Sequence, residues 1–129
     1  MNHPQMNSSF RLILPADMGY LLVARMALTG FGMLARLDVD QIDDLRIIAD
    51  ECCDCLMHQG KFIGEISIFA YVSQSRFCCC FIGEQRGEIT GEPPQDKEIT
   101  RCILETLLPD VQMRDDEYGI HCIEVSMPL

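Results

Sequence analysis

The alternation of apolar and polar positions predicts strands and amphipathic helices in a defined order. Apolar residues at every second position over Phe10–Leu14 indicate a short strand, which Pro15 ends. The spacing of apolar residues then changes to three and four, which is typical of a helix. We expect this first helix to be capped by Asp17 and to run to about Leu37.

A second helix is predicted to start at Asp38 or Asp40 and to end at Gly60, a residue that favours helix termination. Its apolar residues follow one another at spacings of 3, 4, 3 and 4, which places them on one buried face. These residues are Ile42, Leu45, Ala49, Cys52 and Leu56.

Two strands follow, over Gly64–Val72 and Arg76–Ile82, and Ser73, Gln74 and Ser75 join them in a tight hairpin. The second of these strands is apolar on both faces, as expected for a central strand covered by helices. The glycine-, glutamate- and proline-rich segment Gly83–Gln95 is predicted to be a loop.

The remaining segments predict one more helix and one more strand. Asp96 can cap the helix, and Pro109 marks its end. The residues expected to share its apolar face are Ile99, Cys102, Ile103, Thr106 and Leu107. A turn at Asp115–Gly119 leads into a last strand over Ile120–Met127.

This order of elements predicts an α/β fold. We expect a two-layer α/β sandwich with helices on one face of a mixed, mostly antiparallel sheet. Residues 1–9 are expected to form a flexible N-terminus, and residues 10–129 to form a single domain, because no linker or internal repeat divides them.

The first predicted helix is apolar over most of its circumference. Its polar stripe is narrow and consists of Arg25, Thr29, Gly32 and Arg36. The other positions include Leu21, Leu22, Val23, Met26, Leu28, Phe31, Met33 and Leu34. A single sheet cannot bury such a helix, so a second apolar surface has to cover it. That surface is either the second helix or a partner molecule, and the sequence leaves both alternatives open.

Composition narrows the classes of partner. The 129 residues carry 10 Lys and Arg against 20 Asp and Glu, a formal net charge of −10. This balance argues against binding to nucleic acids or anionic membranes. The longest apolar run, Phe77–Ile82, is too short to span a bilayer, and Met1–Ser9 lacks the features of a secretory signal. We expect a cytoplasmic protein.

The eight cysteines form clusters rather than a disulfide framework. Cys52 and Cys55 make a CxxC pair without a second pair, which is a weak indication of a zinc site. The preferred interpretation is that cysteine serves as a small apolar residue, and no metal site is expected. An alternative is metal or redox sensing by Cys52, Cys53, Cys55, Cys78 and Cys80.

One long segment resembles a known family. Residues Leu14–Gly60 read LPADMGYLLVARMALTGFGMLARLDVDQIDDLRIIADECCDCLMHQG. With its "LPA" after the first strand, its "VAR" in the first helix and its acidic start to the second helix, this segment resembles the N-terminal half of the anti-sigma-factor serine kinases. These kinases belong to the GHKL group of ATPases. The resemblance extends by order of elements over residues 10–126 and implies a Bergerat-type fold.

The resemblance implies a set of nucleotide-binding positions, most of which have changed. Glu51 matches the glutamate that activates phosphoryl transfer. Cys55 stands where the family has a Mg²⁺-binding asparagine, and a thiol is a poor ligand for this hard ion. Asp54 is the nearest alternative oxygen ligand, and Gly83 replaces the aspartate that recognises adenine. The glycine-rich phosphate loop is also missing.

These departures predict a regulatory protein-binding module without kinase activity and without a cofactor. The resemblance implies a protein partner, a sigma factor or an antagonist of one, and a homodimer. It places Arg25, the arginine of "VAR", at the partner contact, whereas an ion pair within the chain is the alternative role. The alternative function is a divergent serine kinase that binds Mg-ATP through Glu51 and Asp54 and phosphorylates a small antagonist protein.

Overall fold

The computed structural model describes residues 8–58, 61–89, 97–107, 110–116 and 119–129. The elements in chain order are β1 (Ser9–Pro15), a 3₁₀ turn η2 (Met18–Tyr20), α1 (Leu21–Leu34), α2 (Val39–Met57), β2 (Lys61–Ser73), β3 (Arg76–Ile89), α3 (Lys97–Leu107), β4 (Asp110–Asp116) and β5 (Gly119–Pro128).

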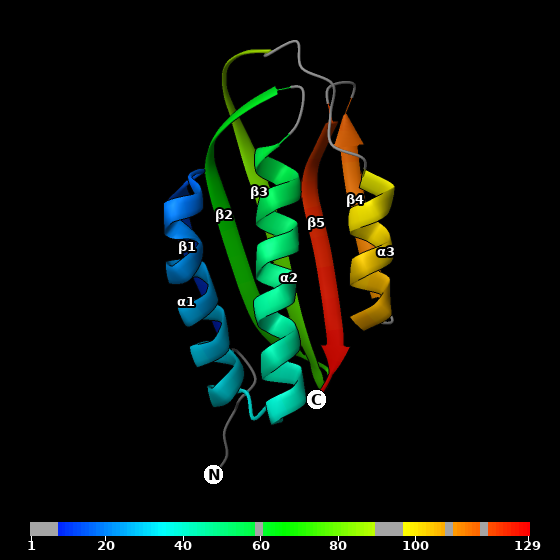
Figure 1. Ribbon diagram of the computed structural model, residues 1–129. Helices are drawn as coiled ribbons and strands as arrows, with labels where there is room; N and C mark the ends of the chain where they lie inside the picture. The colour runs from blue at the N-terminus through cyan, green and yellow to red at the C-terminus, as the bar shows by residue number, and fades with distance from the viewer. Residues whose placement is uncertain (1–7, 59–60, 90–96, 108–109, 117–118) are drawn as a thin grey trace.

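The strands form one sheet in the order β1-β2-β3-β5-β4. All strand pairs of the described residues are antiparallel, so the expectation of a mixed sheet was wrong in this part of the chain. The three α-helices lie on one face of this sheet, with α2 between α1 and α3 (Figure 1). The α/β fold with helices on one face of the sheet is thus confirmed.

The first helix is shorter than expected at both ends. Asp17 caps the 3₁₀ turn rather than α1, since its carboxylate accepts a 2.8 Å hydrogen bond from the backbone N–H of Gly19. At the other end, α1 stops at Leu34 instead of Leu37. The cause is Arg36, whose φ of 68° is incompatible with continuation of the helix.

This helix end has the hydrogen bonds of a Schellman motif. The N–H of Leu37 donates to the carbonyl of Gly32, and the N–H of Arg36 donates to the carbonyl of Met33, both at 3.0 Å. Glycine usually occupies the left-handed position, and Arg36 stands there instead, so this helix end is difficult to predict from the sequence.

The second helix agrees with its prediction at its start and on its buried face, but it ends before the predicted Gly60. Asp38 and Gln41 form a reciprocal capping box, with bonds of 2.8 and 3.0 Å between each side chain and the backbone N–H of the other. The five residues predicted for the buried face are all buried. The helix ends at Met57, and Gly60 lies outside the described residues.

The hairpin between β2 and β3 is as tight as predicted. Gln74 and Ser75 form its turn with φ values of 51° and 62°, the pattern of a type I′ turn. The predicted loop from Gly83 was wrong, because β3 continues to Ile89 and pairs it with Lys61. Irregular register near Ile63 accommodates this extension, which leaves only residues 90–95 of the predicted loop outside the described residues.

The C-terminal part differs most from expectation. α3 buries Thr100 and Leu104, whereas three residues of its predicted face, Ile99, Cys102 and Thr106, are exposed. The proposed cap Asp96 lies outside the described residues. The strand β4 was missed, and Asp115, expected in a turn, belongs to it.

The described part of the N-terminus is also more ordered than expected. Ser9 pairs with Tyr71 at the start of β1, and the carbonyl of Ser8 accepts a 3.1 Å hydrogen bond from the N–H of Val72. The prediction of a flexible segment over residues 1–9 was therefore wrong for Ser8 and Ser9. Residues 1–7 lie outside the described residues.

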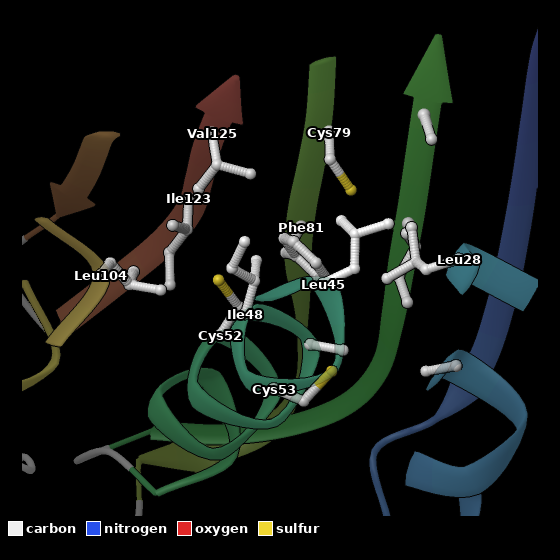
Figure 2. Close-up of a cluster of buried hydrophobic side chains, with 14 of the residues drawn as sticks. Leu28, Leu45, Ile48, Cys52, Cys53, Cys79, Phe81, Leu104, Ile123 and Val125 are labelled. Atoms are coloured by element: carbon white, nitrogen blue, oxygen red, sulfur yellow. The ribbon is translucent and has the colours of Figure 1, made fainter. Parts of the chain in front are cut away.

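The hydrophobic core fills the space between the helices and the sheet. Figure 2 shows Leu45, Ile48 and Cys52 of α2 against Phe81 of β3 and Ile123 of β5. These side chains are fully buried. Burial of a large aliphatic or aromatic side chain contributes about 1.5–3 kcal/mol, so this layer fixes α2 on the sheet.

Candidate functional site

Glu51 lies on the C-terminal half of α2 and is partly buried. Its pKa is raised above the ordinary value, first by burial and then by the negative charges of Asp54 and Asp50. A raised pKa suits a general base, yet the same result arises wherever carboxylates crowd a helix. The position of Glu51 is therefore compatible with the role in phosphoryl transfer that the resemblance implies, but it does not identify Glu51 as a general base.

Cys55, at the position where the resemblance implies a Mg²⁺-binding asparagine, points into the protein interior. Its side chain is 1% exposed. Burial raises the pKa of its thiol, whereas the neighbouring hydroxyl of Thr100 on α3 lowers it by a smaller amount. The side chain that would hold Mg²⁺ is thus packed against α3 as a neutral thiol.

Asp54 is the residue that could replace this ligand, and it already has a partner. Its carboxylate lies 2.7 Å from Nδ1 of His58, one helical turn later. Both side chains are partly exposed, so the contact is a surface pair on the last turn of α2.

Gly83, at the expected adenine-recognition position, lies in the middle of β3 rather than after its end. It is buried, and a Cβ at this position would lie 3.3 Å from Cδ2 of Leu56 and 3.4 Å from two carbon atoms of Ile63. This glycine lets β3 pass closely beneath the end of α2. No backbone turn is available here for a nucleotide.

The electrostatics of α2 also disfavour a triphosphate. The pKa of Asp44 is raised by burial and by the negative charges of Asp40, Asp43 and Asp38, just as that of Glu51 is raised by its own acidic neighbours. The negative charges of these neighbouring carboxylates, and not their burial, give α2 a potential that repels polyphosphate anions.

Arg25 pairs with α2. Its Nε lies 2.7 Å from Oδ1 of Asp50, and its Nη2 lies 3.1 Å from Oδ2, which makes a bidentate ion pair. Asp50 raises the pKa of the guanidinium through this hydrogen bond. The pair ties α1 to α2, the alternative that the sequence left open for Arg25.

The outer surface of α1 is covered by neither the sheet nor α2. Only Leu21, Ala24, Leu28 and Gly32 of this helix are buried. We call the exposed apolar residues on the opposite side the α1 stripe; they are Leu22, Val23, Met26, Met33 and Leu34. Met26 is 65% exposed and Leu34 is 82% exposed, so the neighbouring helix does not provide the second apolar surface.

The cysteines divide between the two faces of the sheet. Cys79 points into the core with Cys52 and Cys53 (Figure 2), whereas Cys78 and Cys80 lie on the opposite face, because side chains alternate along a strand. The hypothesis that all these cysteines meet in one site was therefore wrong.

A cluster that the sequence did not predict lies on the helix-free face of the sheet. One ligand atom each from Cys80, Cys122 and Glu124 lie within 4.8 Å of one another. The register of β3 with β5 brings them together, and the sequence carries no direct sign of that register. Only the Cys-x-Glu spacing within β5 could have indicated part of the cluster.

No family model matches the chain, and no curated protein matches it. Among the helices that the structure describes, none combines the length and the apolar character needed to cross a bilayer.

Proposed function

We propose that this protein is a regulatory protein-binding module, similar to the anti-sigma-factor serine kinases, that lacks kinase activity. The antiparallel sheet with helices on one face and the order of its elements support a Bergerat-type fold. The observation that carries the proposal is the α1 stripe, an exposed set of apolar side chains on one side of a helix that is held to α2 by Arg25 and Asp50.

The chemistry of the nucleotide positions supports the absence of kinase activity. Phosphoryl transfer requires a Mg²⁺ ligand of oxygen type and a backbone loop that approaches the phosphates. Instead of the oxygen ligand, the chain has the buried thiol of Cys55. Instead of the loop, it has Gly83, which lies within a strand. Glu51 remains beside Asp50 and Asp54, whose negative charges oppose the binding of a phosphate.

The α1 stripe suits a protein partner because its side chains are apolar and lie on one rigid element. Burial of a leucine or methionine side chain contributes about 1.5–3 kcal/mol, so a few of these residues can anchor an interface. The resemblance implies a sigma factor or its antagonist as the occupant. A homodimer would use the same stripe.

Thermal unfolding with and without millimolar Mg-ATP tests the missing activity. A ligand at 100 times its dissociation constant would stabilise the fold by about 2.7 kcal/mol. We expect no change in the unfolding temperature and no transfer of phosphate to a serine-containing antagonist protein. A Mg²⁺-dependent shift together with transfer would establish the divergent kinase instead.

The variant Met26→Glu tests the interface. We expect it to weaken binding to sigma factors or antagonists of the host at least tenfold, measured by titration calorimetry, because it places a charge within the buried patch. The control is Ile99→Glu on α3, since Ile99 is 58% exposed but lies outside the α1 stripe.

Sedimentation equilibrium of the same variants tests whether the chain forms a homodimer through the α1 stripe. A dimer that Met26→Glu dissociates and Ile99→Glu leaves intact would identify a second copy as the occupant. Partner binding and self-association that are both unaffected by Met26→Glu would refute the α1 stripe as an interface.

A further inference from the structure

The face of the sheet opposite the helices carries a polar and sulfur-rich surface. Its central residues come from three adjacent strands, since side chains of one parity share a face. They are Phe69 and Tyr71 of β2, Cys78 and Cys80 of β3, and Cys122, Glu124 and Ser126 of β5. None of the described helices lies over them (Figure 1).

The register of β3 with β5 sets three metal-binding groups beside one another. Cys80 lies opposite Glu124, and Cys122 lies two residues before Glu124 on the same face. The Sγ atoms of Cys80 and Cys122 are 3.2 Å apart, and a carboxylate oxygen of Glu124 completes a triangle with no side above 4.8 Å.

We propose that Cys80, Cys122 and Glu124 form a binding site for a single zinc-like divalent cation. Two thiolates and one carboxylate are ligands of the type that zinc accepts, and three protein ligands leave one tetrahedral position open. This site is independent of the proposed protein-binding function, because it lies on the other face of the sheet from the α1 stripe.

The distances suit a tetrahedral ion after small movements. With Zn–S bonds of about 2.3 Å, two sulfur ligands of a tetrahedral zinc lie roughly 3.8 Å apart. The observed sulfur separation of 3.2 Å has to widen by about half an ångström, which a χ1 adjustment of either cysteine provides. The strands themselves need not move.

A disulfide between the same cysteines fits less well. Cys122 lies opposite Ile82, so Cys80 and Cys122 are diagonal rather than directly paired neighbours. Diagonal positions in an antiparallel pair have Cα atoms about 7–8 Å apart, and disulfides rarely bridge more than about 6.8 Å. A cation between the sulfur atoms spans the larger gap.

Glu124 supplies the negative charge of the cluster, whereas the two cysteines bind a cation only as thiolates. A bound divalent ion therefore has to displace both thiol protons. Arg114 lies 3.1 Å from Oε1 of Glu124 and can orient the carboxylate from outside.

The open coordination position faces a hollow in the same surface. Its volume is about 410 Å³, and its lining includes Tyr71, Cys78, Cys80, Gln112 and Glu124. Water or a small exogenous ligand can reach the ion from this side. Cys122, which is 6% exposed, is the buried ligand of the proposed site.

Titration of the reduced, chelator-treated full chain with Co²⁺ and then Zn²⁺ tests the site. We expect one Co²⁺ per chain with a thiolate-to-cobalt charge-transfer band, and its loss when one equivalent of Zn²⁺ displaces the cobalt. The variants Cys80→Ser and Cys122→Ser should each abolish the charge-transfer band at this stoichiometry. Glu124→Gln should weaken zinc binding at least tenfold in competition with a chromophoric chelator.

Two controls separate this cluster from the other cysteines. Cys78→Ser removes a thiol from the same face of β3, and Cys102→Ser removes the exposed thiol of α3. Both should leave the stoichiometry and the spectrum unchanged. Circular dichroism of each variant establishes that the fold is retained.

Three results would overturn the proposal. The first is the absence of stoichiometric Co²⁺ or Zn²⁺ binding by the folded wild-type chain. The second is binding that survives in the folded Cys80→Ser/Cys122→Ser double variant. The third is a purified chain whose mass is lower by two hydrogens, with Cys80 and Cys122 linked in one peptide.

Discussion

Glu51 illustrates how one residue's environment sets a measurable property. It lies partly buried on α2, with Asp50 and Asp54 nearby, and its pKa is raised above 4.5. A raised pKa means that the folded state holds the proton more tightly than the unfolded state does. The charged carboxylate therefore lowers the free energy of unfolding above the raised pKa, whereas the protonated form does not.

The variant Glu51→Gln should be more stable than the wild type at pH 7, because the neutral amide removes this penalty. The difference should shrink as the pH falls through the raised pKa and should vanish below 4.5, where both states of the wild type are protonated. Urea unfolding as a function of pH measures it. Glu105→Gln is the control, since Glu105 is exposed on α3. A difference independent of pH would contradict this account.

Single residues were predictable where their role is local. The second helix was expected to start at Asp38 or Asp40, and Asp38 caps it in a capping box. Arg25 was expected either at a partner contact or in an ion pair, and it forms an ion pair with Asp50. The partner contact stays a prediction. The sequence could not name Asp50, because the pairing depends on which residue of α2 faces α1.

At the scale of elements, α1 carries two glycines with opposite surroundings. A Cβ on Gly32 would lie 2.9 Å from Cδ1 of Ile42 and 2.9 Å from Cδ1 of Leu45, whereas a Cβ on Gly30 would meet nothing within 4 Å. Gly32 therefore lets α1 approach α2 closely. Gly30 only weakens the helix.

Replacement of each glycine by alanine should give stability changes of opposite sign. Gly30→Ala should raise the free energy of unfolding by up to about 1 kcal/mol, through helix propensity. Gly32→Ala should lower it by about 1–3 kcal/mol, because the core side chains have to move. Urea unfolding of both variants measures this, and a destabilised Gly30→Ala would show that this position is covered by another molecule.

Elements were predictable where periodicity is strong and misplaced where it is weak. The buried face of α2 follows from its apolar spacing alone. In α3, Thr100 is buried and Ile99 is 58% exposed, which reverses the order expected from polarity. β4 was missed because its sequence DVQMRDD is half-polar, as an edge strand with one covered face can be.

At the scale of the whole molecule, burial divides the cysteines into two chemical populations. Cys52 and Cys79 are fully enclosed, and burial raises the pKa of both thiols well above the ordinary value. Cys102 is exposed on α3. Reactivity with electrophiles requires an accessible thiolate, so these populations should differ strongly.

Alkylation with iodoacetamide at about pH 8 should reveal this difference. We expect Cys102 to react first, and Cys52 and Cys79 to react only when the protein unfolds. Peptide mass spectrometry at successive times measures the order, and the same reaction in denaturant is the control, in which all sites react alike. Equal rates for Cys52 and Cys102 in the native protein would contradict the buried assignment.

The candidate sites differed in how far the sequence could predict them, because some depend on single positions and one depends on the pairing of two strands. The resemblance to the anti-sigma-factor serine kinases assigns Cys55 and Gly83 to nucleotide-binding positions, and this assignment stays a prediction. The cluster of Cys80, Cys122 and Glu124 was not foreseen, because it exists only once β3 and β5 pair in one register. The residues between these two strands give no direct information about that register.

The position of β5 has a consequence for synthesis of the protein. It follows β4 along the chain but lies between β3 and β4 in the sheet. Translation starts at the N-terminus, so β1, β2 and β3 can pair while β3 still has an open edge beside Phe77 and Phe81. Residues 90–128 take roughly 2–8 s to translate. During that interval the nascent chain presents an unpaired apolar strand, the type of surface on which chains aggregate and chaperones act.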